Sequence, residues 1–185
     1  MTQHLQSVGM IEFNSIATGI QAADHMAKAA VVEPLMLKTI CPGKFVVAVH
    51  GEIASVSAAV DAGLTWSEDT VVDHFVIPSI NPDVVTALSG TLKDGKGSAL
   101  GVIETFSAAS AIVAADTASK AADIRVAEVR VAMGLGGKGL CILSGDVAAV
   151  EMAVSAGSSA ASESGLLVAK VVIPSISPEI LEHVL

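Results

Sequence analysis

The chain has 185 residues, of which 52% are hydrophobic and 16% are charged, and its formal net charge is −9. A typical soluble domain carries about 25% charged residues. We therefore expect subunit contacts to hide much of this chain's surface. The acidic balance and the lack of a basic run exclude binding to a phosphate backbone. Five scattered aromatic residues exclude a base-stacking surface for single-stranded nucleic acid.

The sequence predicts neither a membrane span nor an export signal. No uncharged apolar run approaches the roughly 20 residues that cross a bilayer. Residues 1–7 lack the basic start and apolar block of a secretory signal. We expect a soluble protein of the reducing cytoplasm, where two cysteines need not form a disulfide.

The sequence contains an internal duplication. Gly9-Met10-Ile11-Glu12 recurs as Gly101-Val102-Ile103-Glu104 at an offset of 92, and residues 76–83 recur as 172–179 at an offset of 96. The segment between the copies is polar and rich in glycine, which is typical of a flexible connection. The sequence predicts a first domain at residues 1–89, a linker at 90–98 and a second domain at 99–185.

Taken in chain order, the first copy begins with a strand at residues 8–13. With Asn14 or Ser15 as N-cap, a helix follows. Apolar, β-branched runs at 31–40 and 45–49 predict two neighbouring strands joined by the turn at 41–44. The helix is expected to bury one apolar face at helical spacing, formed by Ile16, Ile20, Ala23, Ala27 and Ala30.

A second helix opens at Gly51-Glu52, and the acidic residue suits a helix N-terminus. A strand at 71–77 and a short helix after Asn81-Pro82, to about Leu88, complete the copy. The second copy repeats this order. The fold class is α/β (α+β): two tandem domains, each a mainly antiparallel four-stranded sheet with flanking helices. One side of the second helix is expected to carry Ile53, Val56, Val60 and Gly63, with Val147, Val150, Val154 and Gly157 as counterparts.

Residues 134–139, called here the glycine turn, contain the pattern G-x-G-x-x-G. A dinucleotide fingerprint needs a helix after this pattern, but an apolar strand-like run follows at 140–143. A P-loop needs Ser or Thr after its lysine, and Gly139 follows Lys138. We expect a tight strand-to-strand turn, in which glycines allow positive φ.

The two cysteines have different settings. Cys141 lies within a predicted strand and reads as a small buried hydrophobe. Cys41 heads residues 41–44, called here the cysteine turn, where the charge of Lys44 favours a thiolate. One thiol cannot satisfy a metal that takes three or four ligands, so chemistry alone favours an inert Cys41.

No catalytic set emerges from the spacing of the remaining polar residues, and we expect no enzyme. The five histidines show no metal-ligand spacing, and no nucleophile elbow occurs. Glu12 and Glu104 could be interpreted as catalytic carboxylates. The simpler interpretation is that each makes the same structural hydrogen bond or ion pair in its own domain. Lys28 and Lys120 lie four residues after aspartates, which predicts a surface ion pair or a lysine at a lattice edge.

Together these residues resemble the shell proteins of bacterial microcompartments, in the class with two fused shell domains. The resemblance rests on residues 8–12, 22–30 and 136–138, the two helix starts at Gly51-Glu52 and Gly145-Asp146, and Val-Ile-Pro-Ser-Ile in both copies. Residues 38–45 are similar to the corresponding turn of the PduT-type subgroup from propanediol-utilising compartments. Ser79 and Ser175 depart from the arginine of many single-domain relatives, so edge packing is expected to differ.

The resemblance implies a homotrimer whose six domains mimic a hexamer and tile edge to edge with other shell proteins. Lys28 and Lys120 match the lattice-edge lysine of the family. The strand-to-strand turns would face a central pore. Its implied lining is Cys41, Pro42, Gly43 and Lys44 from the first domain and Gly134, Leu135, Gly136, Gly137 and Lys138 from the second.

In the PduT type, the turn cysteines of three subunits hold one [4Fe–4S] cluster on the threefold axis, with a non-protein fourth ligand. The resemblance thus implies Cys41 as the cluster ligand, with electron transfer across the shell or cluster delivery to the interior as the role. One alternative is a shell pore for small metabolites without a cluster. Another is an enzyme or ligand-binding regulator of ferredoxin-like type.

Overall fold

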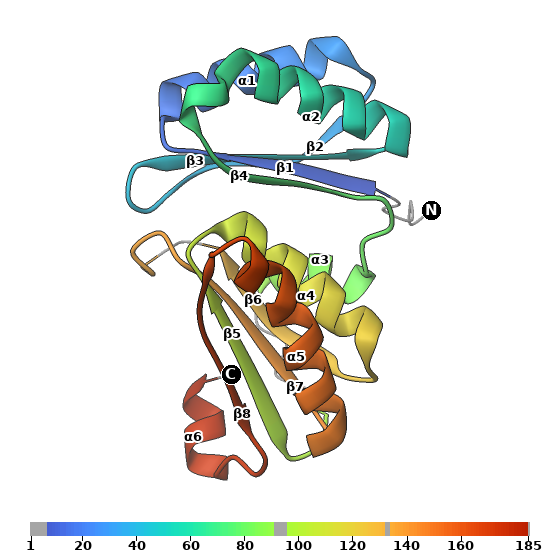
Figure 1. The fold of residues 1–185 in the computed structure, drawn as a ribbon, viewed down its shortest axis with the longest axis vertical. Helices are drawn as coiled ribbons and strands as arrows, with labels where there is room; N and C mark the ends of the chain where they lie inside the picture. Colours follow the sequence, from blue (N-terminus) through green and yellow to red (C-terminus); the bar gives the residue numbers. More distant parts are fainter. Residues whose placement is uncertain (1–6, 91–95, 132–133, 185) are drawn as a thin grey trace. The chain divides into compact units, whose positions relative to one another are not determined.

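The computed structural model describes residues 7–90, 96–131 and 134–184, and these form two compact units that each contain one sheet (Figure 1). In both copies the elements follow the predicted order of strand, helix, strand, strand, helix, strand and short helix. The α/β prediction of two four-stranded antiparallel sheets with flanking helices is confirmed. No helix within the described ranges is both long and apolar enough to cross a bilayer.

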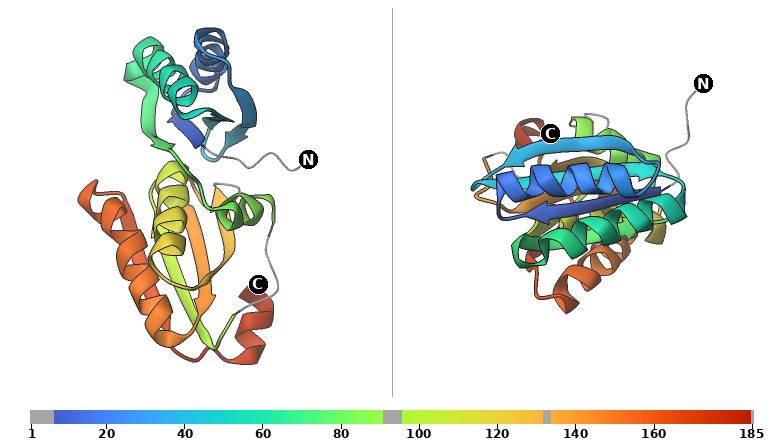
Figure 2. Two further views of the ribbon diagram at one scale, coloured as in Figure 1. Left: turned by 90° about the vertical axis from the view of Figure 1, so that its right-hand side faces the viewer. Right: turned by 90° about the horizontal axis from the view of Figure 1, so that it is seen from above.

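The sheet of the first unit has the strand order β2-β3-β1-β4, and its neighbouring strands are antiparallel. Helices α1 and α2 lie side by side over one face of it (Figures 1 and 2). Ser15 caps α1, as predicted, because its Oγ accepts from the N–H of Thr18. The elements are β1 (Ser7–Phe13), α1 (Ile16–Ala29), β2 (Glu33–Ile40), β3 (Lys44–Gly51), α2 (Ile53–Ser67), η1 (Glu68–Thr70) and β4 (Val71–Ile77).

The sheet of the second unit repeats this topology with the strand order β6-β7-β5-β8. Helices α4 and α5 pack on one face, whereas Leu181 and Val184 of α6 pack on apolar residues of the other face, around Leu100 and Ile142. The elements are α3 (Pro82–Ser89), β5 (Ala99–Thr105), α4 (Ala108–Ala121), β6 (Arg125–Val131), β7 (Gly139–Gly145), α5 (Val147–Glu163), β8 (Leu167–Ile173) and α6 (Pro178–Val184).

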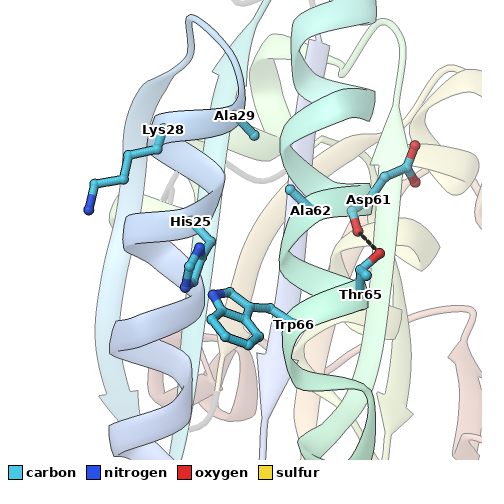
Figure 3. A pocket seen from close by; sticks show the side chains of 7 residues that line it. All are labelled: His25, Lys28, Ala29, Asp61, Ala62, Thr65 and Trp66. Atoms are coloured by element: carbon cyan, nitrogen blue, oxygen red, sulfur yellow. Dashed lines mark hydrogen bonds between the residues drawn. The ribbon is translucent and has the colours of Figure 1, made fainter.

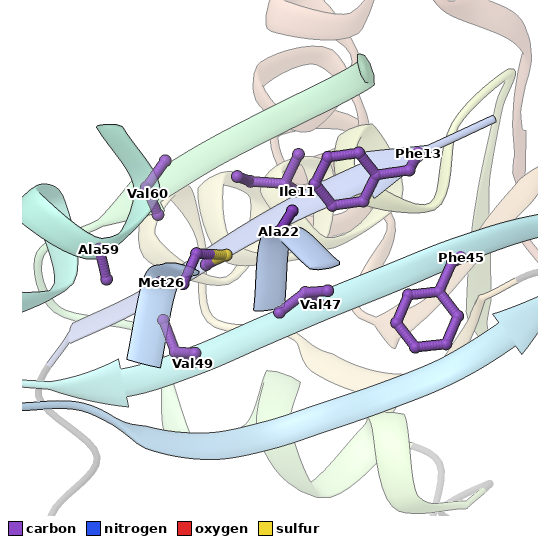
Figure 4. Packing of buried hydrophobic residues seen from close by; sticks show 9 residues of the cluster. All are labelled: Ile11, Phe13, Ala22, Met26, Phe45, Val47, Val49, Ala59 and Val60. Carbon is purple, nitrogen blue, oxygen red and sulfur yellow. The ribbon is translucent and has the colours of Figure 1, made fainter. Parts of the chain in front are cut away.

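The core of the first unit lies between its sheet and its two helices (Figure 4). Alternate residues of β1 and β3 point into it, as expected for strands with one face on a core. Gly63 brings α2 close to Ile11, because a Cβ at that position would lie 2.7 Å from the Ile11 side chain. The buried cluster contains Ile11, Phe13, Ala22, Met26, Phe45, Val47, Val49, Ala59 and Val60.

The buried face of α1 differs from the predicted apolar face. Ile16 and Ile20 are 37% and 56% exposed, and Ala27 is exposed as well. A Cβ at Gly19 would lie 2.8 Å from Cδ1 of Phe45, so the helix approaches the sheet along its smallest residues. The buried residues of α1 are Gly19, Ala22 and Met26. Of the expected face, Ile16, Ile20 and Ala27 point outward, whereas Ala23 and Ala30 are partly buried against the core.

The predicted apolar side of the second helix in each copy is confirmed in large part. Val56, Val60 and Gly63 are buried in α2, and Val150, Val154 and Gly157 are buried in α5. The two residues that begin these helices are the exceptions, because Ile53 is 38% exposed and Val147 is only partly buried. Glu52 and Asp146 occupy the N-cap positions of these helices, where the helix dipole favours their charge.

Helix α3 follows β4 along the chain, yet it packs against β6 and α4 in the second unit. Asn81 caps α3, as predicted, and its own N–H donates to Oδ1 of Asp116 at 2.8 Å. Val84 and Ala87 bury the apolar side of the helix. The boundary at residue 89 stays a prediction, and residues 91–95 of the predicted linker at 90–98 lie outside the described residues.

Candidate functional site

The cysteine turn connects two antiparallel strands, as predicted. Ile40 at the end of β2 pairs with Lys44 at the start of β3, so three residues make the connection. The Cys41–Pro42 peptide bond is cis, and Gly43 has φ of 77°. No heavy atom lies within 4 Å of the place where a Cβ of Gly43 would stand. This tight turn presents the Cys41 side chain to the outside.

The glycine turn makes the equivalent connection in the second sequence copy, between β6 and β7. Val131 of β6 pairs with Gly139 of β7, and seven residues separate the two strands. Gly136 and Gly137 have φ of 60° and 88°, a region that glycine enters without steric cost. A strand follows the turn rather than a helix, so the prediction of a strand-to-strand turn instead of a dinucleotide fingerprint is confirmed.

An ion pair ties the cysteine turn to the central strand of its sheet. Lys44 Nζ donates to Glu12 Oε1 at 2.8 Å. The strand register explains this contact, because Glu12 lies opposite Val46 and the diagonal position on the same face belongs to Lys44. The Glu12 side chain is fully buried and that of Lys44 is 16% exposed.

The second copy repeats this ion pair. Lys138 Nζ donates to Glu104 Oε1 at 3.0 Å, with Glu104 opposite Leu140 in the register. The interpretation of the two glutamates as repeated structural ion pairs is confirmed. Sequence reasoning did not identify the lysine partners. Both members recur in both copies, and this recurrence was the available signal.

The two cysteines differ as their sequence settings predicted. Cys141 lies in β7 with no exposed surface, and burial raises the pKa of its thiol to about 12. Cys41 is exposed and free. Within the described residues, no three His, Cys, Asp or Glu side chains gather closely enough to hold a metal ion. The chain thus presents one accessible thiol, on the cysteine turn.

Lys28 and Lys120 each bind the aspartate four residues before them, as predicted for a helical pair. The settings of the two pairs differ. Asp24 is exposed, whereas Asp116 is buried and also accepts the N–H of Asn81. The same surface motif is therefore a solvated pair in the first unit and part of a helix contact in the second.

An open pocket lies on the outer side of α1 and α2 in the first unit (Figure 3). The rings of His25 and Trp66 meet edge to face there, with centroids 4.3 Å apart. The second copy has Thr117 and Ala160 at the corresponding positions, so the His–Trp ring pair is not repeated there. Sequence reasoning treated both rings as isolated residues, because 41 positions separate them.

The BMC domain model matches the chain twice, at residues 7–80 and 99–176, with one match for each sheet. The chain belongs to the BMC-domain family. It is a tandem-domain shell protein of bacterial microcompartments, and such proteins are structural rather than catalytic. Both matches end just before the short helices α3 and α6.

Several known proteins match most or nearly all of the chain. The shell protein PduT of Citrobacter freundii is 43% identical over 91% of this chain and 92% of its own length. The crystal structure of a microcompartment protein from Desulfitobacterium hafniense DCB superposes with a TM-score of 0.82 at 49% identity, covering 95% of this chain and 98% of that one. A fused, permuted hexameric shell protein from the RMM microcompartment has a TM-score of 0.65 at 27% identity, covering 84% and 81%.

Proposed function

We propose that this BMC-domain protein assembles as a trimer in which the cysteine turns surround a central pore and hold one [4Fe–4S] cluster. The observation that carries the proposal is the exposed thiol of Cys41 on a tight strand-to-strand turn, in a chain similar to PduT over nearly its whole length. Each chain of the trimer brings one such thiol, so the cluster is a property of the assembly.

The different environments of α3 and α6 support the trimer. Val84 of α3 is fully buried, whereas its counterpart Ile180 in α6 is 54% exposed. Asp116 accepts the N–H of Asn81, whereas its counterpart Asp24 is exposed. Leu181 and Val184 of α6 pack on their own sheet, but if the exposed Ile180 side packs on the next chain as Val84 packs in its own, the contact is head-to-tail. Three two-domain chains close such a ring with six domains.

The cysteine turn fits the chemistry of an iron–sulfur ligand. Iron–sulfur clusters are held by cysteine thiolates, and exposed thiols at turns are accessible for ligation. Three copies of Cys41 on one axis supply three thiolates, and the fourth iron takes a non-protein ligand. The space around Gly43 leaves the turn free of side-chain crowding on that side. Pro42 and Gly43 keep the ligand on a short connection.

The cluster gives the shell a one-electron centre at its pore. It would accept an electron from a low-potential carrier on one side and pass it to an oxidised carrier on the other, or be delivered to a recipient protein in the interior. Gly134, Leu135, Gly136, Gly137 and Lys138 of the second domain complete the pore lining. Lys28 and Lys120 lie at the edges that meet other shell proteins.

Anaerobic purification tests the proposal, with Cys41→Ala compared with Cys141→Val. The wild-type protein is expected as a brown trimer with about four iron atoms per trimer, the content of one [4Fe–4S] cluster. Cys41→Ala is expected to lose colour and iron but remain a trimer. Cys141→Val is expected to keep both, because Val47 stands at its counterpart.

Two results would contradict the proposal in different ways. A wild-type protein that stays colourless and iron-free after reconstitution leaves Cys41 as a thiol lining a pore for small metabolites. A monomer in analytical ultracentrifugation contradicts the trimer itself.

A further inference from the structure

The positive charge of Lys44, in the cysteine turn, is balanced by the carboxylate of Glu12. The ammonium donates to this carboxylate, which has no exposed surface, at 2.8 Å. A buried carboxylate is stable only with such compensation. Lys44 therefore takes part in the cysteine turn as one half of an ion pair.

The corresponding pair beside the glycine turn is much more open. Glu104 is 33% exposed and Lys138 is 41% exposed, against 0% and 16% for the pair beside Cys41. Water and salt screen exposed ion pairs strongly and buried pairs much less. The strong, poorly screened pair occurs in the copy that carries the thiol.

We infer that Glu12 is a positioning residue that sets the reduction potential of the cluster by compensating Lys44, an inference that rests on the proposed function. Three thiolates leave the cluster anionic, and reduction adds one more negative charge. A nearby positive charge therefore stabilises the reduced form and raises the potential, which depends on the net charge and exposure of the site. Glu12 holds the potential below the value that an uncompensated lysine would give.

The threefold arrangement enlarges this effect. In the proposed trimer, three Glu12–Lys44 pairs would lie around one cluster, so one substitution in the gene would change three charges near one redox centre. Lys44 begins β3 directly after the turn, so its contact with Glu12 joins this end of the turn to β1.

Glu12→Gln tests the inference with little change in shape. The amide oxygen still accepts from Lys44, while each chain gains one positive charge. Spectroelectrochemical titration is expected to show a higher midpoint potential at unchanged iron per trimer. The matched variant Glu104→Gln makes the same chemical change beside the glycine turn and is expected to shift the potential much less. Glu12→Gln/Lys44→Gln removes both charges and is expected to return the potential towards the wild-type value.

Three results would overturn the inference alone: an unchanged potential in Glu12→Gln, equal shifts in Glu12→Gln and Glu104→Gln, or a double variant that keeps the shift of the single one. If Glu12→Gln does not assemble, Glu12→Asp replaces it, because the shorter side chain weakens the contact with Lys44 and predicts a smaller rise. A wild-type trimer without iron overturns the proposed function and this inference together. That result is distinguishable from an iron-containing trimer whose midpoint potential is the same in the wild type and in Glu12→Gln.

Discussion

The cysteine turn and the glycine turn occupy the same place in two copies of one fold. Both connect antiparallel strands, and both are tied to the central strand by a Glu–Lys pair. One is a three-residue connection with a thiol, and the other is a seven-residue connection rich in glycine. A duplicated scaffold thus allows a ligand in one copy alone. Six identical domains would offer six thiols, whereas three fused pairs offer three.

The largest difference between the copies is expected when each turn lysine is removed. Lys44→Ala removes the lysine that pairs with the fully buried Glu12, and breaking a buried pair typically costs about 3–5 kcal/mol. Lys138→Ala acts on a half-exposed pair worth about 0–1 kcal/mol. Urea denaturation of the two variants measures the contrast. Equal losses would show that the two pairs contribute alike, despite their different burial.

A second contrast concerns the first helix of each copy. Gly19 contacts Phe13 and Phe45 closely, whereas its counterpart in α4 is Ala111. Gly19→Val is expected to lower the free energy of unfolding by about 2–3 kcal/mol, because it overpacks the core. Ala27→Val on the exposed side of the same helix is the control, with an effect within about 0.5 kcal/mol. Similar losses in both variants would contradict the observed orientation of α1.

The buried cysteine of the second copy predicts a pH dependence of stability. The thiol of Cys141 has its pKa raised by burial from 9.0 to about 12, so the folded state retains a proton that the unfolded state releases. Its contribution to stability is complete below pH 9 and is lost as the pH rises towards 12. The slope is about 1.4 kcal/mol per pH unit.

Cys141→Val is the control for this pH dependence, because Val47 fills the corresponding position in the first copy. The variant is expected to flatten the alkaline part of a stability profile measured by denaturation between pH 8 and about 10.5. An unchanged slope would assign the alkaline loss to other groups.

The smallest effects are expected at the helix-end lysines. Lys28→Ala removes an exposed pair and should change stability by at most about 0.5 kcal/mol. Lys120→Ala should cost somewhat more, about 1 kcal/mol, because its partner Asp116 is buried and holds α3 as well. Thermal unfolding compares the two. Electron microscopy of the two-dimensional protein layers that each variant forms tests the proposed lattice-edge role separately from stability.

Element order, both turns and several helix caps could be predicted because their signals are local or repeated. Ser15 and Asn81 cap helices through contacts with residues two or three positions away. The buried face of α1 could not be predicted from hydrophobicity, because close approach at Gly19 decides which side meets the sheet. The Glu12–Lys44 contact joins residues 32 positions apart through the strand register. Periodicity within one segment contains no information about that register.

Helix α3 packs against β6 and α4 of its own chain. One helix-to-domain junction is therefore part of every polypeptide, whatever the protein concentration. In the proposed trimer, three of the six junctions around the ring would be unimolecular, and the other three would depend on encounters between chains. Tethering of this kind replaces bulk concentration with a high effective concentration. A fused subunit should therefore close its ring at lower concentration than six separate domains of the same intrinsic affinity.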